Sequence, residues 1–278
     1  MTAQQDIRIE PFFLPSETGP LFCIGLLPTQ RTPRAALLYL HPFAEEMHKS
    51  RRTVALQARR LAREGFAVLQ VDLRGCGDSW GDFADATWQG WLYDAHTAFS
   101  WLRERASSVP MILWGLRLGA TLAAELSAQL EAVPHHLLLW QPVLDGELFL
   151  NQFLRLKLAS EMLTVGSAQV DTKTLRTRLN SGETIEIGGY ALSASLANVL
   201  AELRLESAPP ASSTLWLDLN QAGQLTPAST RVVHAWQAQE AQVTVSVIAG
   251  PPFWSTQEIV ECHPLIDATT AALLECWP

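Results

Sequence analysis

The sequence predicts an α/β protein built on a mostly parallel, twisted sheet. Apolar runs of strand length alternate with amphipathic helical segments, and several of these runs are apolar throughout, as strands buried on both faces are. Four strand–helix alternations precede residue 142, and such alternation requires right-handed crossovers and parallel strands. The chain has 278 residues, 48% of them hydrophobic, which is enough for a sizeable core.

Each expected element follows from a local pattern. An antiparallel hairpin is expected first, because two β-rich runs at residues 7–14 and 20–28 flank a Ser-Glu-Thr-Gly turn. Buried strands are then expected at residues 35–42, 66–73, 111–115, 135–142, 213–219 and 242–250. The helices between them carry apolar residues at helical spacing, and Thr87 can cap the second of these helices.

The alternation stops between residues 143 and 210. Two helical stretches and a short β segment with paired glycines take its place, over a length too great for a plain loop. We expect an inserted, mainly helical cap at residues 143–210, over the carboxyl edge of the sheet. Residues 1–142 and 211–278 would form the core.

Composition argues against several classes of protein. The net charge of −8 does not suit a general nucleic-acid surface, which needs a basic stripe. No apolar run approaches the ~20 residues of a membrane helix, and the first ten residues are polar, so a cytoplasmic protein without a membrane span is expected. The four cysteines form no C-x-x-C pair, which favours buried free thiols and no metal or cofactor.

Three short motifs, each behind an expected strand, indicate where the chemistry lies. The first is the turn at residues 41–43, and the second is D-L-R-G-C-G-D-S at residues 72–79. The third, G-L-R-L-G at residues 115–119, has the outline of the nucleophile elbow G-x-S-x-G, with Arg117 where the nucleophile belongs. By position, the amides of an oxyanion hole would be those of Phe43 and Leu118.

In this order the motifs resemble the α/β-hydrolase fold over nearly the whole chain. That resemblance places the catalytic acid and base in turns after the last two strands. When the chain is aligned on Pro227, Gly223 occupies the position of the acid, and Pro252 occupies that of the base. All three catalytic positions then hold residues that cannot act in a Ser-Asp-His triad. We therefore expect a hydrolase scaffold with a degenerate triad.

A relocated active site is the alternative hypothesis. The residues that could supply it are Cys76, Ser79, Asp218 and His263. The first two lie in the glycine-rich loop, the third lies five residues before the acid position, and the last lies about ten residues beyond the base position. With these groups the protein would hydrolyse an ester or a thioester.

Arg117 needs an anionic partner, because a cation in an enclosed pocket costs several kcal/mol unless it is paired. Three accounts stay open: Glu45 forms only an exposed pair with Lys49; Glu45 or Glu46 forms an internal salt bridge to Arg117; or Arg117 binds a carboxylate or phosphate ligand at the helix N-terminus. The residues expected around such a ligand are His41, Phe43, Glu45, Glu46, Arg117, Leu118, Trp140 and Trp254.

Longer motifs resemble one branch of this fold. They are HPFAEEMHKSRR, DLRGCGDS, WGLRLGA, WQPVLDGELFLNQFLRL and GPPFW. Together they resemble the hydrolase-like proteins associated with the exosortase (PEP-CTERM) protein-sorting system of Gram-negative bacteria. The resemblance implies a bacterial protein encoded beside exosortase and exopolysaccharide functions. We expect an accessory protein that binds an anionic or acylated ligand or proteins of that system; a protein-interaction subunit that uses its tryptophans and cap is a further alternative.

Overall fold

One sheet of eight strands forms the centre of the molecule, as a computed structural model of residues 7–130, 133–165 and 171–277 describes it. The strand order is β1-β2-β4-β3-β5-β6-β9-β10. The strands are β1 Ile7–Leu14, β2 Leu21–Pro28, β3 Ala36–Leu40, β4 Ala67–Val71, β5 Met111–Leu116, β6 His136–Trp140, β9 Thr214–Leu219 and β10 Val243–Ile248. The pairs β1–β2 and β2–β4 are antiparallel and the others are parallel, so the predicted mixed sheet is confirmed.

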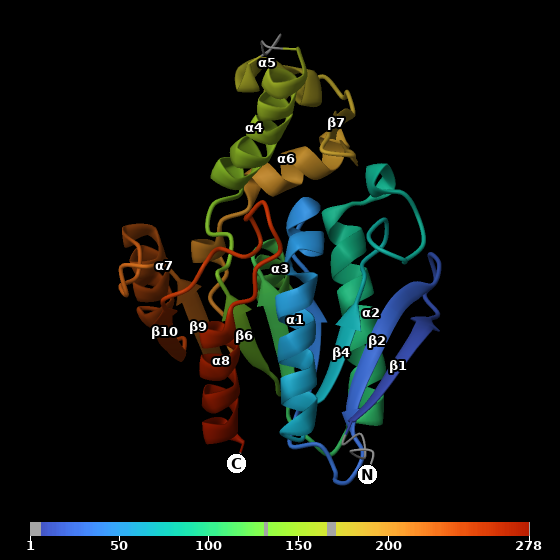
Figure 1. The fold of residues 1–278 in the computed structure, drawn as a ribbon, viewed down its shortest axis with the longest axis vertical. Coiled ribbons are helices and arrows are strands. Elements are labelled where there is room, and N and C mark those ends of the chain that lie inside the picture. The colour runs from blue at the N-terminus through green and yellow to red at the C-terminus, as the bar shows by residue number, and fades with distance from the viewer. Residues whose placement is uncertain (1–6, 131–132, 166–170, 278) are drawn as a thin grey trace.

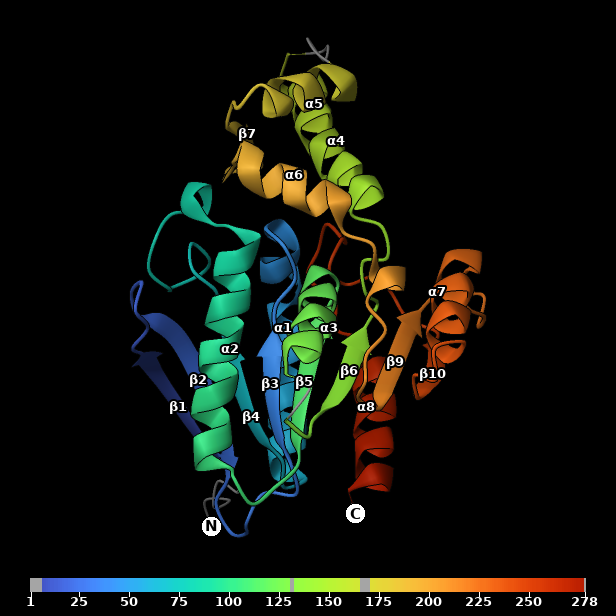
Figure 2. The same ribbon diagram turned by 180° about the vertical axis from the view of Figure 1, so that it is seen from behind.

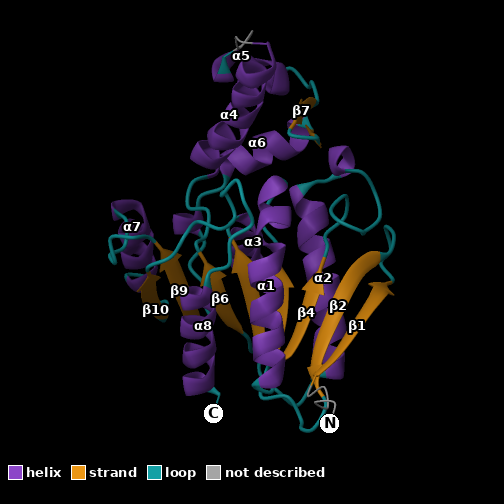
Figure 3. Cartoon of the chain, viewed as in Figure 1, coloured by secondary structure: helices purple, strands orange, loops and turns teal. Residues whose placement is uncertain are grey.

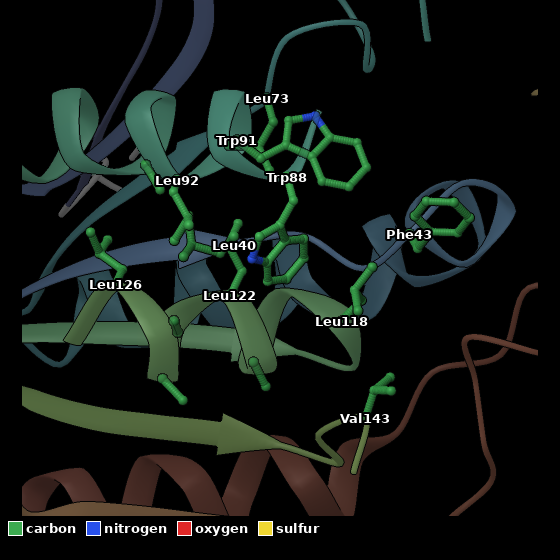
Figure 4. Close-up of a cluster of buried hydrophobic side chains, with 14 of the residues drawn as sticks. Leu40, Phe43, Leu73, Trp88, Trp91, Leu92, Leu118, Leu122, Leu126 and Val143 are labelled. Atoms are coloured by element: carbon green, nitrogen blue, oxygen red, sulfur yellow. The ribbon is translucent and has the colours of Figure 1, made fainter. Parts of the chain in front are cut away.

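Helices cover both faces of this sheet. They are α1 Glu45–Arg63, α2 Trp88–Arg105, α3 Leu118–Gln129, α7 Pro227–Gln237 and α8 His263–Cys276, with a short 3-10 turn at Phe83–Asp85. Helices α1 and α8 lie together on one face (Figure 1), and α2 and α3 lie together on the other (Figure 2). Figure 4 shows Trp88 and Leu92 of α2 turned toward Leu122 and Leu126 of α3 in the core of that second face.

A smaller group of elements stands above the carboxyl ends of the strands (Figure 3). It comprises α4 Gly146–Val165, α5 Thr172–Asn180, the hairpin β7 Ile185–Ile187 and β8 Tyr190–Leu192, α6 Ala194–Glu202 and a 3-10 turn at Leu205–Ser207. These elements occupy the stretch where the sequence departs from strand–helix alternation. Residues 166–170 of the expected cap, like residues 1–6 of the expected core, lie outside the described residues.

Helix starts follow the local chemistry of the sequence. The Thr87 hydroxyl accepts a hydrogen bond from the amide of Gly90 at 3.0 Å and so caps α2, as predicted. Gly146 begins α4 where the chain leaves no room for a side chain, because a Cβ there would lie 1.7 Å from the carbonyl oxygen of Leu200 in α6. In the described part of the chain, no helix combines the length and the apolar character needed to cross a membrane.

Candidate functional site

The turn from β5 into α3 is an intact nucleophile elbow that carries an arginine. Arg117 has φ 56° and ψ −120°, and α3 begins at the next residue. Close packing requires the flanking glycines: a Cβ on Gly115 would lie 2.4 Å from the Cα of Ala120, and one on Gly119 would lie 2.3 Å from the carbonyl oxygen of Leu40. The backbone of the elbow is therefore preserved, while its central side chain is a cation.

An ion pair joins this elbow to the first turn of α1. The Nε atom of Arg117 donates to Oε1 of Glu46 at 3.2 Å, and the two side chains are only 15% and 11% exposed. This contact is the internal salt bridge that one of the three accounts of Arg117 requires. It connects the loop after β3 with the turn after β5, the two places where the fold would build an oxyanion hole and a nucleophile.

Two aromatic rings flank the same guanidinium. The Cζ atom of Arg117 lies 5.3 Å from the centre of the Trp254 ring and 5.9 Å from that of Phe149 in α4. Trp254 comes from the loop after β10, two residues past Pro252, which the alignment predicts at the base position. The loop that would carry a catalytic histidine thus presents an aromatic face to the cation, an arrangement that stabilises a guanidinium.

Burial makes the charge on Glu46 costly. It raises the pKa of Glu46 to about 7, although the nearby Arg117 opposes the shift, and the second carboxylate oxygen has no hydrogen-bond partner among the described residues. Burial also raises the pKa of the neighbouring Glu45, which Lys49 and Arg117 lower to a smaller extent. The ion pair therefore holds a carboxylate that gains a proton close to neutral pH.

Aromatic side chains fill the space where an acyl group would sit in a hydrolase. The ring of Phe43 lies 5.4 Å from Phe83, 6.0 Å from Trp91, 5.7 Å from Phe149 and 4.9 Å from Phe153. The cavity that remains beside Phe43 and Leu118 has a volume of about 10 Å³, which is no more than one water molecule needs. No acyl chain fits against the two expected oxyanion amides in this arrangement.

His41 has a structural role in the turn after β3. Its Nε2 accepts a hydrogen bond from the amide of Leu73 at 3.2 Å, which leaves Nδ1 protonated to donate to the carbonyl oxygen of Pro42 at 2.7 Å. Burial lowers the pKa of His41, so the ring stays neutral. Both nitrogens are thus engaged with backbone, and the ring has no free atom with which to act as a base.

The loop at residues 72–79 is held by internal bonds. The Ser79 hydroxyl donates to the carbonyl oxygen of Asp72 and accepts from the amide of Phe22, at 2.5 and 2.7 Å. Arg74 binds the fully buried carboxylate of Asp94 in α2 through two nitrogens, at 2.6 and 2.9 Å. Burial raises the pKa of Cys76 far above its usual range, so its thiol keeps the proton and is a poor nucleophile.

The remaining candidates for relocated chemistry lie apart. His263 is exposed at the start of α8 and lies 2.9 Å from Glu261. Asp218 is buried near the end of β9, where burial raises its pKa and the nearby Ser229 and Gln141 oppose the shift. Within the described residues, no hydrogen bond joins any two of Cys76, Ser79, Asp218 and His263, and no cluster of side chains is arranged to hold a metal ion.

The structure corrects the expectation for Trp140. Its side chain is fully buried in the core on the α1–α8 face, where Nε1 donates to the hydroxyl of Thr269 in α8 at 3.0 Å. The sequence places Trp140 at a strand end. Successive side chains of a strand point to opposite faces of the sheet, and the side chain of Trp140 points into the core on the α1–α8 face. Trp254 and Phe149 are the aromatic residues beside Arg117.

A cleft opens on the other side of Arg117, between α4 and α7. Its volume is about 240 Å³, and it combines apolar walls with three arginines. Its lining includes Arg117, Gln141, Leu148, Phe149, Gln152, Arg204, Arg231 and Val232. Arg204 pairs with Asp145 and Arg231 pairs with Glu206, each at 3.5 Å. The cleft therefore places three arginines, each paired with a carboxylate, beside an apolar surface, and the carboxylates of Asp145 and Glu206 also line it.

Three of the turns at this edge are strained. Ala44, Arg117 and Gln141 have φ values of 48°, 56° and 43°, and they follow the adjacent strands β3, β5 and β6. Residues other than glycine rarely adopt such backbone angles, and they concentrate at functional sites. The Gln141 side chain is itself fixed, since Oε1 accepts from the amide of Leu219 at 2.6 Å.

Sequence reasoning did not find the walls of the cleft. Gln152, Arg204 and Arg231 come from α4, the loop after α6, and α7, so no local spacing links them. Gln141 lies in the motif WQPVLDG. The motif contributed to the family resemblance, but it did not indicate a role for the Gln141 side chain. Glu46 was one of two acidic candidates in the first turn of α1, and only its position on the helix distinguishes it from Glu45.

The parallel sheet, the elbow and the cap above its carboxyl edge define the α/β-hydrolase fold. A family model described as "Serine aminopeptidase, S33" matches residues 31–183, which is more than half of the chain. The chain belongs to this family. The matched region includes the elbow and the turn after β3, but it ends before the loops that carry Gly223 and Pro252.

Curated relatives match a shorter segment. Lysophosphatidylserine lipase ABHD12 of Xenopus tropicalis is 32% identical over 114 residues, which are 40% of this chain and 28% of that protein. Protein ABHD12B of Homo sapiens is 37% identical over 95 residues, which are 34% of this chain and 25% of that protein. The matches span about a quarter of the length of these relatives.

Two solved structures are similar in fold over nearly the whole chain. Est1E from Butyrivibrio proteoclasticus, solved with ferulic acid bound, has a TM-score of 0.69 and 15% identity over 95% of this chain and 98% of that one. A thermostable carboxyl esterase from Bacillus coagulans has a TM-score of 0.66 and 16% identity over 96% and 97% of the two chains. At this level of identity the likeness concerns the fold.

Proposed function

We propose that the protein is a hydrolase-fold protein without hydrolytic activity, which binds a small anionic or acylated ligand in the cleft beside Arg117. The observation that carries the proposal is the position of Arg117: it replaces the nucleophile, pairs with Glu46 and forms part of the cleft wall. Gly223 lies in an exposed loop. The alignment that assigns Gly223 to the acid position and Pro252 to the base position supports the proposal. The aromatic filling near Phe43 also leaves no room for an acyl group at the elbow.

The chemistry of the cleft suits a carboxylate or a phosphate that carries an apolar chain. Arg117 and the N-terminus of α3 favour negative charge, and an arginine fork binds carboxylate and phosphate well. Leu148, Phe149 and Val232 supply apolar wall for a short chain. The motifs that resemble exosortase-associated proteins support a further part of the proposal, namely an accessory role in exosortase or exopolysaccharide systems; the cytoplasmic location stays a prediction.

The test of inactivity uses labelling and turnover. We expect no labelling of the wild type by a fluorophosphonate probe and no turnover of short p-nitrophenyl esters. Arg117→Ser should not restore activity, because the acid and the base are also missing. Turnover by the wild type that survives in Arg117→Ala would instead support relocated chemistry and overturn this proposal.

The test of binding uses octanoate, which joins a carboxylate to an acyl chain, and inorganic phosphate, which lacks the chain. Isothermal titration should show octanoate binding that Arg117→Gln weakens about tenfold, as the loss of a charge-assisted hydrogen bond predicts. Arg155→Gln is the matched control, because Arg155 is exposed on α4 and does not line the cleft. Equal weakening by both variants would show only a general charge effect.

A protein-interaction role is the second candidate, and exposed apolar side chains on the cap favour it. Leu148 and Met162 of α4 and Val199 of α6 are 63%, 59% and 40% exposed. Of the tryptophans expected to serve such a role, only Trp80 ranks among the exposed large apolar residues of the described chain. Met162→Ser/Val199→Ser, at two exposed residues that do not line the cleft, should leave octanoate binding nearly unchanged and would abolish any association that depends on the cap.

A further inference from the structure

A second cavity lies under α1, against strands β2, β3 and β4. Its volume is about 170 Å³, and its walls come from β2, β3, β4 and α1. The apolar part of the lining includes Phe22, Ile24, Tyr39, Met47, Val54 and Ala55. It shares no residue with the cleft beside Arg117. Phe22 and Ile24 of β2, which line the cavity, are half-buried.

One polar group in this apolar lining is unused. Tyr39 is 5% exposed, and its hydroxyl has no hydrogen-bond partner among the described residues. Ser50 lies near enough to lower the pKa of this hydroxyl as a hydrogen-bond partner does, but no well-aligned hydrogen bond joins the two hydroxyls, and the Ser50 hydroxyl donates to the carbonyl oxygen of Met47 at 3.1 Å. Burial raises the pKa of Tyr39 well above its usual range, so the hydroxyl keeps its proton and remains a donor. A buried donor without an acceptor is unfavourable unless a ligand or water supplies one.

The charged groups in the wall are already paired. Arg51 donates to the carboxylate of Asp72 at 3.1 Å, and the same carboxylate accepts from the amide of Asp78. His41 is neutral, and both of its nitrogens bind backbone groups. No unpaired charge in this wall selects an ion, so the lining suits a neutral molecule.

We propose that the cavity under α1 binds a small neutral molecule of about the size of phenol, whose oxygen accepts a hydrogen bond from the Tyr39 hydroxyl. Apolar cavities of about 150 Å³ hold benzene, so a single six-membered ring fits the volume. The ring packs against Met47, Val54 and Ile24, while Tyr39 distinguishes an oxygen-bearing ligand from a hydrocarbon of the same shape.

Two fluorinated probes of equal shape test this site. Fluorine NMR titration of the full chain with 4-fluorophenol and 4-fluorotoluene should show saturable shifts for both. Tyr39→Phe should weaken 4-fluorophenol about three- to tenfold and leave 4-fluorotoluene within about twofold, because the variant loses one hydrogen bond and no volume. Ala55→Leu should weaken both about tenfold, because it fills the cavity.

Two controls test where the probes bind and whether the variants are folded. Arg117→Gln should leave both probe affinities unchanged, which separates this cavity from the proposed ligand cleft. Circular dichroism checks that each variant is folded, and Tyr39→Phe keeps the test valid if Ala55→Leu fails to fold. Absence of any saturable shift, equal weakening of both probes by Tyr39→Phe, or loss of binding in Arg117→Gln would each overturn the proposal.

Discussion

The guanidinium of Arg117 and the carboxylate of Glu46 lie 3.2 Å apart and join two turns that are 71 residues apart in the sequence. In an active hydrolase these turns would supply the nucleophile and an oxyanion amide. Here they hold opposite charges that are nearly enclosed. The pair thus lies at the turn that carries the nucleophile in a hydrolase, and its energetics can be measured directly.

A double-mutant cycle should show strong coupling across this pair. Arg117→Gln leaves a buried carboxylate without its cation, so it should be destabilised by about 2–4 kcal/mol. Glu46→Gln removes a charge that burial disfavours, so it should change the free energy of unfolding much less. The double variant should recover part of that loss, with a coupling energy of about 1–3 kcal/mol. Urea unfolding at pH 8, where Glu46 is ionised, measures both quantities; additive losses would mean that the contact contributes nothing.

Glu46 should make the stability and the binding depend on pH. Its pKa is raised to about 7 in the folded protein, above the ordinary 4.5, so the folded state binds the extra proton between these values. The free energy of unfolding should therefore fall as pH rises from about 4.5 to 7, relative to Glu46→Gln, which lacks the titrating group. Urea unfolding across this range compares the two proteins.

Ligand binding should follow the same titration. Below about pH 7 the protonated Glu46 no longer competes for Arg117, so the affinity for octanoate should rise as pH falls to 6, where octanoate stays ionised. The pH dependence should disappear in Glu46→Gln. Affinity that falls with decreasing pH in the wild type would contradict the competition between ligand and Glu46.

Gly119 should be more sensitive to substitution by alanine than Gly223, the glycine that the alignment on Pro227 predicts at the acid position. An alanine Cβ at Gly119 would lie 2.3 Å from the carbonyl oxygen of Leu40, so Gly119→Ala should cost about 3 kcal/mol or more by overpacking. Gly223→Ala meets no atom within 4 Å and costs only its positive φ of 67°, about 1–2 kcal/mol. Thermal unfolding of both variants checks the order; equal losses would show that the elbow adjusts to the added methyl group.

The sequence predicted most of the fold because its signals are local. Strands buried on both faces read as continuous apolar runs, the Thr87 cap precedes its helix, and the elbow glycines mark a turn with no room for side chains. These features depend on neighbours in the chain. The order of the outer strands and the packing of the cap on Phe43 depend on contacts between distant segments, which no local pattern specifies.

The site was predictable only in part, for the same reason. The need of Arg117 for an anion follows from electrostatics, and the first turn of α1 was the nearest source of carboxylates. The choice of Glu46 over Glu45 depends on the rotation of α1, and the orientation of Trp140 depends on the register of β6. The arginines of the cleft come together only through the placement of α4 and α7.

The cysteines give the last prediction, which bears on relocated catalysis. Cys23, Cys76 and Cys262 are buried, and burial raises the pKa of each thiol, whereas Cys276 is exposed near the end of α8. A thiol reagent such as Ellman's should therefore label Cys276 quickly in the native protein and the other three only on unfolding, because only the thiolate of an accessible cysteine reacts. Cys276→Ser should abolish the fast phase. A fast phase that persists in Cys276→Ser and vanishes in Cys76→Ser would instead identify Cys76 as an activated nucleophile and favour the relocated active site.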